Sequence, residues 1–433
     1  MLEPTKNIIQ NGPLRFLRVG RHVKDLTAEE VQAAREYIAT YWPKLTRYHP
    51  KDDGSVLGLP KPYLVSSYEE GREFDFNEMY YWDSYFNVQG FLDEDHRELV
   101  MGILEDLFSL FKRFKTIPNA SRTYLTGRSQ PPLLTTFIFD VYTVYGLDDK
   151  WLKQSIEIAK EEYHTVWMGT KKPNARQVYQ GLSRYYDINL THDLAEAESG
   201  WDYNPRFSRR ALNYLPVDLN ALLYKYETDF ARAARILGNE TDAEEWDHLA
   251  SKRKRTMNSL MWDHLKGLYY DYNYVKEHQG SVSSLATFYP MWMGMVTKTQ
   301  AKELVKALRR FEMKGGVATT DSVPFGKYVP GSMPTQWAYP NGWAPHQFIV
   351  IKALQRYGYH EDARRIAMRW LRTNLSWFNH NGIFLEKYNV VSPDKPPMKG
   401  VYPTQTGFAW TNAIFERFCQ EFIDGIPDPT QKS

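Results

Sequence analysis

Residues 344–378 read APHQFIVIKALQRYGYHEDARRIAMRWLRTNLSWF, and this stretch decides the fold class of the chain. Its first part is apolar on all sides at Phe348-Ile349-Val350-Ile351, which predicts an inner helix covered by other helices. Gly358 ends that helix, because glycine readily adopts the left-handed conformation of a helix C-terminus. Residues 360–378 are amphipathic and predict an outer helix. Successive pairs of this kind could form a ring.

Other segments carry helix signals of the same kind. Thr27-Ala28-Glu29-Glu30 is a capping box and predicts a helix start, and Thr241-Asp242-Ala243-Glu244 repeats that signal. Residues 216–238 place their apolar side chains on one stripe and end at Gly238. Strand signals are few and short, and no strand-helix alternation appears at regular spacing. The pattern therefore predicts an all-α protein.

Long irregular stretches separate the predicted helices. They are rich in Gly, Pro and aromatic residues and cover 50–83, 116–132, 170–206, 312–343 and 379–410. Loops of this length are uncommon in a compact domain unless they carry function. No linker divides the chain, so we expect an N-terminal arm over 1–24, one catalytic domain over 25–423 and a frayed tail over 424–433.

Composition excludes several classes of protein. The 433 residues contain 54 Lys plus Arg against 52 Asp plus Glu, a balance that gives no support to nucleic-acid binding. The single cysteine, Cys419, cannot form an internal disulfide, which fits a reducing compartment. No apolar run approaches membrane-span length, so no membrane partner is predicted. These features predict a soluble cytoplasmic protein. The aromatic content of 15% has two interpretations, a core of large rings or a carbohydrate-binding cleft.

Three of the long loops contain dense aromatic motifs with a carboxylate or an amide. These are EMYYWDSYF at 78–86, ESGWD at 198–202 and QWAYPNGWAP at 336–345. With these motifs the chain resembles the trehalases of glycoside hydrolase family 37. RSQPP at 128–132, FLEKYNV at 384–390 and GFAWTN at 407–412 follow the family's order and approximate spacing. The resemblance runs from about residue 60 to the C-terminus, further than one short motif could reach by chance.

The resemblance implies an (α/α)6 barrel that hydrolyses the α,α-1,1 bond of trehalose with inversion. By motif match, Asp202 is the general acid and Glu386 the general base. An inverting pair needs one protonated and one ionised carboxyl group, about 6.5–9.5 Å apart to admit a water molecule. Each residue has a plainer interpretation. Asp202 could cap a following helix, and Glu386 could form a surface ion pair with Lys387.

The same match implies a set of sugar-binding residues, which hydrogen-bond the glucosyl units or wall the pocket with rings. They are Phe76, Tyr80, Trp82, Asp83, Asn119, Arg128, Ser129, Gln130, Arg184, Gly200 and Trp337. Arg184 stands in for an arginine whose family element is absent from this chain. For the aromatic members the alternative is ordinary core packing. No metal or cofactor is expected, because proton transfer suffices for the reaction.

Three positions depart from the family pattern and bear on substrate choice. Asp75 stands where an arginine is expected, Ala338 replaces an aspartate, and Val401 falls at or near an expected glutamate. The predicted partner is a small disaccharide or α-glucoside. Trehalose is favoured, with glucosylglycerol or glucosylglycerate as alternatives that share the glucosyl subsite. A non-catalytic sugar-binding barrel is the remaining alternative.

Overall fold

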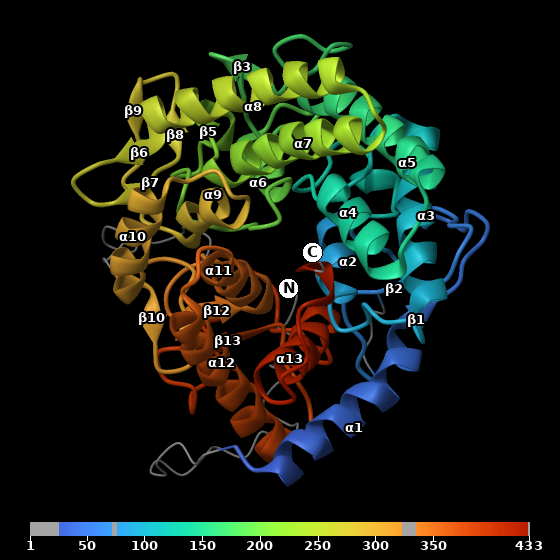
Figure 1. The fold of residues 1–433 in the computed structure, drawn as a ribbon. Helices are drawn as coiled ribbons and strands as arrows, with labels where there is room; N and C mark the ends of the chain where they lie inside the picture. The colour runs from blue at the N-terminus through green and yellow to red at the C-terminus, as the bar shows by residue number, and fades with distance from the viewer. Residues whose placement is uncertain (1–25, 72–75, 323–334, 432–433) are drawn as a thin grey trace, which may run out of the picture.

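The computed structural model describes residues 26–71, 76–322 and 335–431, and its helices alternate between an inner and an outer ring (Figure 1). The inner ring consists of α2 (Tyr81–Asn87), α4 (Leu134–Tyr145), α7 (Val217–Ile236), α9 (Tyr289–Trp292), α11 (Ala344–Arg356) and α13 (Ala409–Phe422). The outer ring consists of α1 (Ala28–Leu45), α3 (Arg97–Phe114), α5 (Asp149–Glu162), α8 (Glu240–Met261), α10 (Lys298–Ala307) and α12 (His360–Asn381). Helix α13 packs against α2 and closes the inner ring. The fold is an (α/α)6 barrel, as expected.

Burial distinguishes the two rings. Every residue of α11 from Ala344 to Leu354 is buried, whereas α12 buries one face. An inner helix is covered by its neighbours in the ring and by an outer helix, so this stretch of α11 has no face exposed to solvent. The predicted inner and outer helices of residues 344–378 are thereby confirmed.

Helix ends follow local capping chemistry, with one correction. The capping box at Thr27 is present, and Gly238 and Gly358 have φ of +76° and +81° after α7 and α11. The predicted start at Thr241 is wrong, because α8 begins at Glu240. The side-chain oxygen of Asn239 accepts from the Asp242 amide at 3.2 Å. Asparagine caps a helix as well as threonine does, so the earlier residue takes the cap.

The long loops contain short antiparallel strands and single turns of helix. The strand pairs are β1 (Thr46–Arg47) with β2 (Tyr63–Leu64), β3 (Gln177–Tyr179) with β4 (Leu182–Ser183), β6 (Trp262–Asp263) with β7 (Leu268–Tyr269), β10 (Glu312–Met313) with β11 (Gly316–Val317) and β12 (Asn341–Trp343) with β13 (Lys387–Asn389). A three-stranded sheet joins β5 (Tyr214–Leu215), β8 (Tyr272–Asn273) and β9 (His278–Gln279). Helix α6 (His192–Ala197) lies in the loop before α7. None of these strands exceeds three residues, so the loops gain order without forming a larger sheet.

The C-terminal tail is docked rather than frayed up to residue 431. Asp428 accepts from Lys352 Nζ at 2.7 Å and from Arg417, and the three charged side chains are at most 8% exposed. Residues Pro429–Gln431 form a 3-10 turn against α4, near the centre of the ring in Figure 1. Buried charges require partners, and this requirement holds the tail in place. The predicted N-terminal arm lies outside the described residues. Within the described ranges, no helix is long and apolar enough to cross a membrane.

Candidate active site

The motif-bearing loops converge because they lead into the inner helices from the same end. EMYYWDSYF enters α2, RSQPP precedes α4, ESGWD precedes α7, QWAYPNGWAP enters α11 and FLEKYNV precedes α13. Strands β12 and β13 join two of these loops directly, with Trp343 paired to Lys387. Side chains far apart in the sequence are thereby gathered at one mouth of the barrel.

Glu386 is held from both sides of its backbone. Its amide donates to the Gln405 carbonyl at 3.0 Å, and Trp410 Nε1 donates to the Glu386 carbonyl at 3.2 Å. Lys387 Nζ forms an ion pair with Oε1 of Glu386, and both side chains are buried. The alternative of a surface ion pair is therefore wrong. Burial raises the pKa of Glu386, the Lys387 ammonium opposes that rise, and the nearby Asp202 charge adds to it.

Asp202 faces the same space from the loop before α7. Gln336 Nε2 donates to its Oδ2 at 3.2 Å, and its side chain keeps some exposed surface. Burial raises its pKa above the ordinary value, while Trp337, Lys387 and Arg128 favour the ionised form. The next helical turn begins at Ala211, so Asp202 does not cap a helix. A partly exposed carboxyl group with a raised pKa is suited to donate a proton.

Stacked indole rings lie next to the two carboxyl groups, because Trp337 interacts with Asp202 and Trp343 with the Lys387 ammonium. Trp337 stacks on Trp343 with ring centroids 3.7 Å apart and an interplanar angle of 4°. The ring centroids of Trp201 and Trp82 lie 6.0 and 5.9 Å from that of Trp337. All four rings are buried, so Trp82 and Trp337 pack in the core and support the residues of the site. Two other predicted aromatic residues, Phe76 and Tyr80, retain exposed surface that a sugar ring could cover.

Gly200 is required by this packing. Its φ is +72°, and a Cβ atom there would lie 2.6 Å from Cε2 of Trp82. Any side chain would collide with the indole and also strain the backbone. The glycine of ESGWD thus allows the Asp202 loop to lie directly on Trp82.

Asp83 is a predicted polar residue whose ionisation is coupled to that of Asp202. It accepts from Ser66 Oγ at 2.8 Å. Burial raises the pKa of Asp83 to about 7, the Ser66 hydrogen bond opposes this rise, and the Asp202 charge contributes to it. Near neutral pH the Asp83 carboxyl group can therefore donate a hydrogen bond when protonated or accept one when ionised.

Three other predicted polar residues bind the backbone of neighbouring loops. Gln130 Oε1 accepts from the Trp82 amide at 3.0 Å, and Asn119 Nδ2 donates to the Ser129 carbonyl at 3.0 Å. Ser129 Oγ donates to the Ile117 carbonyl at 2.6 Å. The Gln130 bond joins the loop before α4 to the start of α2 and holds Trp82 and Asp83 in position, whereas the other two bonds fix the shape of the loop before α4.

The two predicted arginines differ in their surroundings. Arg128 Nη1 donates to Asp187 Oδ2 at 3.2 Å, and its buried Nε has no hydrogen-bond partner among the described residues. The positive charge of Arg128 also favours the ionised form of Asp202. Arg184 instead donates to the carbonyls of Ala175 at 3.0 Å and Leu212 at 2.7 Å, and to two further loop residues, Asn174 and Tyr274. Arg184 therefore links neighbouring loops, and its hydrogen-bond donors are used by protein atoms.

Three further residues of the site were absent from the predicted set. Gln336 donates to Tyr402 Oη at 2.9 Å as well as to Asp202, so it links two loops at the site. Gln336 could have been predicted because it is the first residue of the QWAYPNGWAP motif, and Lys387 because it directly follows Glu386. Tyr402 had no such signal, because it lies in the region where the chain departs from the family pattern. Burial and the charges of Glu386 and Asp202 raise the pKa of Tyr402, so its hydroxyl stays protonated.

The positions that depart from the family have different surroundings. Ala338 is buried and its carbonyl accepts from the Asn341 amide at 2.9 Å. Val401 is 41% exposed. Asp75 lies outside the described residues.

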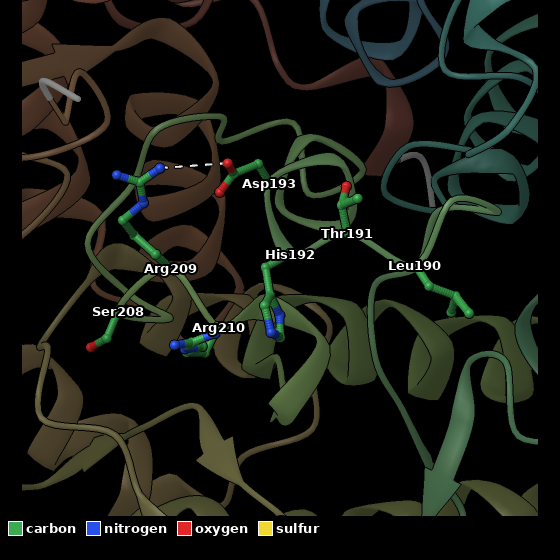
Figure 2. Close-up of a pocket in the computed structure, with 7 residues that line it drawn as sticks. All are labelled: Leu190, Thr191, His192, Asp193, Ser208, Arg209 and Arg210. Atoms are coloured by element: carbon green, nitrogen blue, oxygen red, sulfur yellow. Dashed lines mark hydrogen bonds and ion pairs between the residues drawn. The ribbon is translucent and has the colours of Figure 1, made fainter. Parts of the chain in front are cut away.

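One surface depression lies apart from the predicted site residues. Figure 2 shows its lining by Leu190, Thr191, His192, Asp193, Ser208, Arg209 and Arg210, with an ion pair of 3.5 Å between Arg209 and Asp193. None of the predicted site residues lines it. No group of three or more His, Cys, Asp or Glu side chains within the described part of the chain could hold a metal ion.

The barrel and its mouth, with two carboxyl groups of raised pKa beside stacked indoles, define the class of (α/α)6 glycoside hydrolases. The family model described as Trehalase matches residues 19–198 and 190–422. The chain therefore belongs to the trehalase family.

Individual relatives agree with this assignment. The cytosolic neutral trehalase of Emericella nidulans is 30% identical over 96% of this chain and 65% of its own length. The periplasmic trehalase of Citrobacter koseri is 31% identical over 89% of this chain and 73% of its own. The solved neutral trehalase of Saccharomyces cerevisiae superimposes with a TM-score of 0.73 at 30% identity, over 83% of this chain and 73% of that one. This chain thus spans about two thirds of the length of these relatives.

Proposed function

We propose that this chain hydrolyses the α,α-1,1-glucosidic bond of trehalose with inversion, releasing two glucose molecules. Family membership supports the reaction, and the observation that carries the proposal is the different pairing of the two carboxyl groups. Glu386 pairs with the Lys387 cation, whereas Asp202 accepts from the neutral amide of Gln336. Two carboxyl groups in one site with different partners can hold different protonation states, which an inverting reaction requires.

The proton transfers follow from this arrangement. Neutral Asp202 donates its proton to the glycosidic oxygen as the bond from that oxygen to the anomeric carbon breaks. Ionised Glu386 takes a proton from a water molecule, whose oxygen bonds to the same carbon from the opposite face. Asp202 ends ionised and Glu386 protonated, and proton exchange with solvent restores both. The rate should therefore fall at low pH when Glu386 is protonated and at high pH when Asp202 ionises, and the two limbs belong to the coupled pair.

Substrate contacts are proposed from the same geometry. Asp83 and Arg128 would hydrogen-bond sugar hydroxyls, and the exposed surfaces of Phe76 and Tyr80 would cover a sugar ring. The buried residues Trp82, Asn119, Ser129, Gln130, Gly200 and Trp337 would hold these groups in place, through the backbone bonds and ring contacts described above. The partner is thus a small disaccharide, and the substitutions at Ala338 and Val401 leave another α-glucoside as the second candidate.

We also propose a cytoplasmic location. The single cysteine, Cys419, is buried and unpaired within the described chain, which suits a reducing compartment. The relatives named above include a cytosolic and a periplasmic protein. Fractionation of the source cells would decide between these compartments, and recovery with the periplasmic fraction would refute the proposal.

Hydrolysis of a small panel of α-glucosides tests the reaction. Trehalose, glucosylglycerol and glucosylglycerate are each incubated with the protein, and proton NMR follows the anomers released at early times. Inversion of trehalose yields one β-glucose and one α-glucose. Cleavage of glucosylglycerate without cleavage of trehalose would support the second candidate. Binding of trehalose without hydrolysis would support the non-catalytic barrel.

Two isosteric variants test the catalytic roles. Asp202→Asn and Glu386→Gln should each lower kcat by about 10²–10⁴-fold, because each keeps its shape and loses proton transfer. Circular dichroism serves as the control for the fold. Activity within tenfold of wild type in either folded variant would remove that residue from its role.

A further inference from the structure

Lys387 is a buried cation next to a proposed catalytic carboxyl group. Neighbouring residues of a regular strand point to opposite faces. The chain bends at Glu386, immediately before β13, and the two neighbouring side chains converge into an ion pair at Oε1. Burying a charge costs several kcal/mol, and a close counter-ion is needed to offset this cost. The local backbone is therefore arranged to bring this cation onto this carboxylate.

Aromatic rings enclose the rest of the ammonium group. Lys387 Nζ lies 4.9 Å from the ring centroid of Trp343, its partner across the β12–β13 pair, and 5.5 Å from that of Tyr402. Both distances are within the range of cation–π attraction. Trp343 is itself immobilised by stacking on Trp337. Among the described residues, Glu386 is the carboxylate with which Lys387 forms an ion pair.

The charged groups around Glu386 make its environment unlike that of Asp202. Lys387 acts from its own strand, Asp202 from the loop before α7 and Tyr402 from the loop before α13. Asp83 of α2 and Arg128 before α4 act on Asp202, and the Lys387 charge also reaches Asp202, although its ion pair is with Glu386. Arg128 is already paired with Asp187, and Tyr402 stays neutral. Lys387 is thus the cation in direct contact with one carboxyl group of the pair, while Asp202 has a neutral amide donor.

We infer that Lys387 is a positioning residue that keeps Glu386 ionised while Asp202 stays protonated, and thereby assigns the base and acid roles. This inference rests on the proposed function. Without the cation, the two carboxyl groups of the site would compete for one proton, and a large fraction of molecules would carry it on the wrong group. The bond to Oε1 also turns the carboxylate so that Oε2 is the oxygen available to the attacking water.

The test compares pH–rate profiles of Lys387→Met, Lys387→Gln and Lys387→Arg with wild type on trehalose. Both neutral variants should move the acid limb of kcat at least one unit to higher pH and lower kcat at least tenfold, with KM changed less than threefold. Lys387→Gln is included because it keeps a hydrogen-bond donor without the charge. Lys387→Arg should return the acid limb toward its wild-type position.

Lys352→Met provides a matched control. Lys352 is also a buried lysine, but its ion pairs are with Glu421 and Asp428 in the docked C-terminal region. This variant should lower Tm and leave the acid limb unmoved. The inference is overturned if the Lys387 variants behave as Lys352→Met does, with lower Tm and an unchanged pH profile.

A measurement without turnover separates this inference from the proposed function. The difference in unfolding free energy between wild type and Glu386→Gln, measured against pH, reports the ionisation of Glu386. Removing Lys387 in both backgrounds should move the midpoint of that difference to higher pH. An unmoved midpoint overturns the inference even if trehalose is hydrolysed. A wild type inactive on every α-glucoside refutes the proposed function while the midpoint still decides the role of Lys387.

Discussion

Substituting Gly200 by alanine should damage both stability and catalysis, in amounts that the structure allows to be separated. The left-handed conformation costs a non-glycine residue about 1–2 kcal/mol. The new Cβ would also lie 2.6 Å from Cε2 of Trp82, and the three nearest atoms all belong to this buried, rigid indole ring. Overpacking of this kind typically costs about 1–3 kcal/mol. The free energy of unfolding should therefore fall by about 2–5 kcal/mol.

Gly238→Ala is the matched control for this prediction. Gly238 has φ of +76°, close to the +72° of Gly200, and no atom lies within 4 Å of its Cβ position. Urea unfolding should show a loss of about 1–2 kcal/mol for Gly238→Ala with unchanged kcat/KM. Gly200→Ala should lose more and also lower kcat/KM at least tenfold, because the collision displaces the loop that carries Asp202. Equal stability losses and equal activities in the two variants would refute this reasoning.

Three more predictions concern charged groups. The folded state keeps the Asp83 carboxyl group protonated up to its pKa of about 7, whereas the unfolded chain loses this proton near pH 4. Between these two pH values the free energy of unfolding should therefore fall as pH rises, by up to about 1.4 kcal/mol per pH unit. Asp83→Asn should remove this slope in urea unfolding measured from pH 4 to 8, and a difference from wild type that does not vary with pH would contradict it. Arg128→Lys should lower kcat/KM at least tenfold, because lysine cannot reproduce the planar fork of donors; a fall in Tm with normal kinetics would show that Arg128 serves only to hold Asp187. Asp428→Asn should lower the unfolding free energy by about 3–5 kcal/mol with kcat/KM retained, because it leaves Lys352 short of a partner, and an unchanged urea midpoint would argue against a docked tail.

Local sequence patterns were sufficient to predict several helices and one inner–outer pair, whereas the barrel of two rings was predicted from the resemblance to the trehalases. The unbroken apolar run in α11 and the amphipathic stripe of α12 each required only the periodicity of one segment. The capping error at α8 was also local, since Asn239 and Thr241 are comparable caps two residues apart. The motif matches led to Asp202 and Glu386 as hypotheses about chemistry, without information on what surrounds them.

The sequence by itself determined that this chain is mainly helical, that the helix after Ala344 is covered on all sides, and that most of its function-bearing residues lie in the long segments between helices. Only the tertiary structure decided which charges meet. Lys387 is buried on Glu386, Arg128 lies near Asp202, Arg184 is occupied by loop carbonyls, and Asp428 draws the tail onto the ring. The reason is physical. Hydrophobic periodicity is a property of a short segment, whereas the ionisation of a buried group depends on desolvation and on charges supplied by distant parts of the chain.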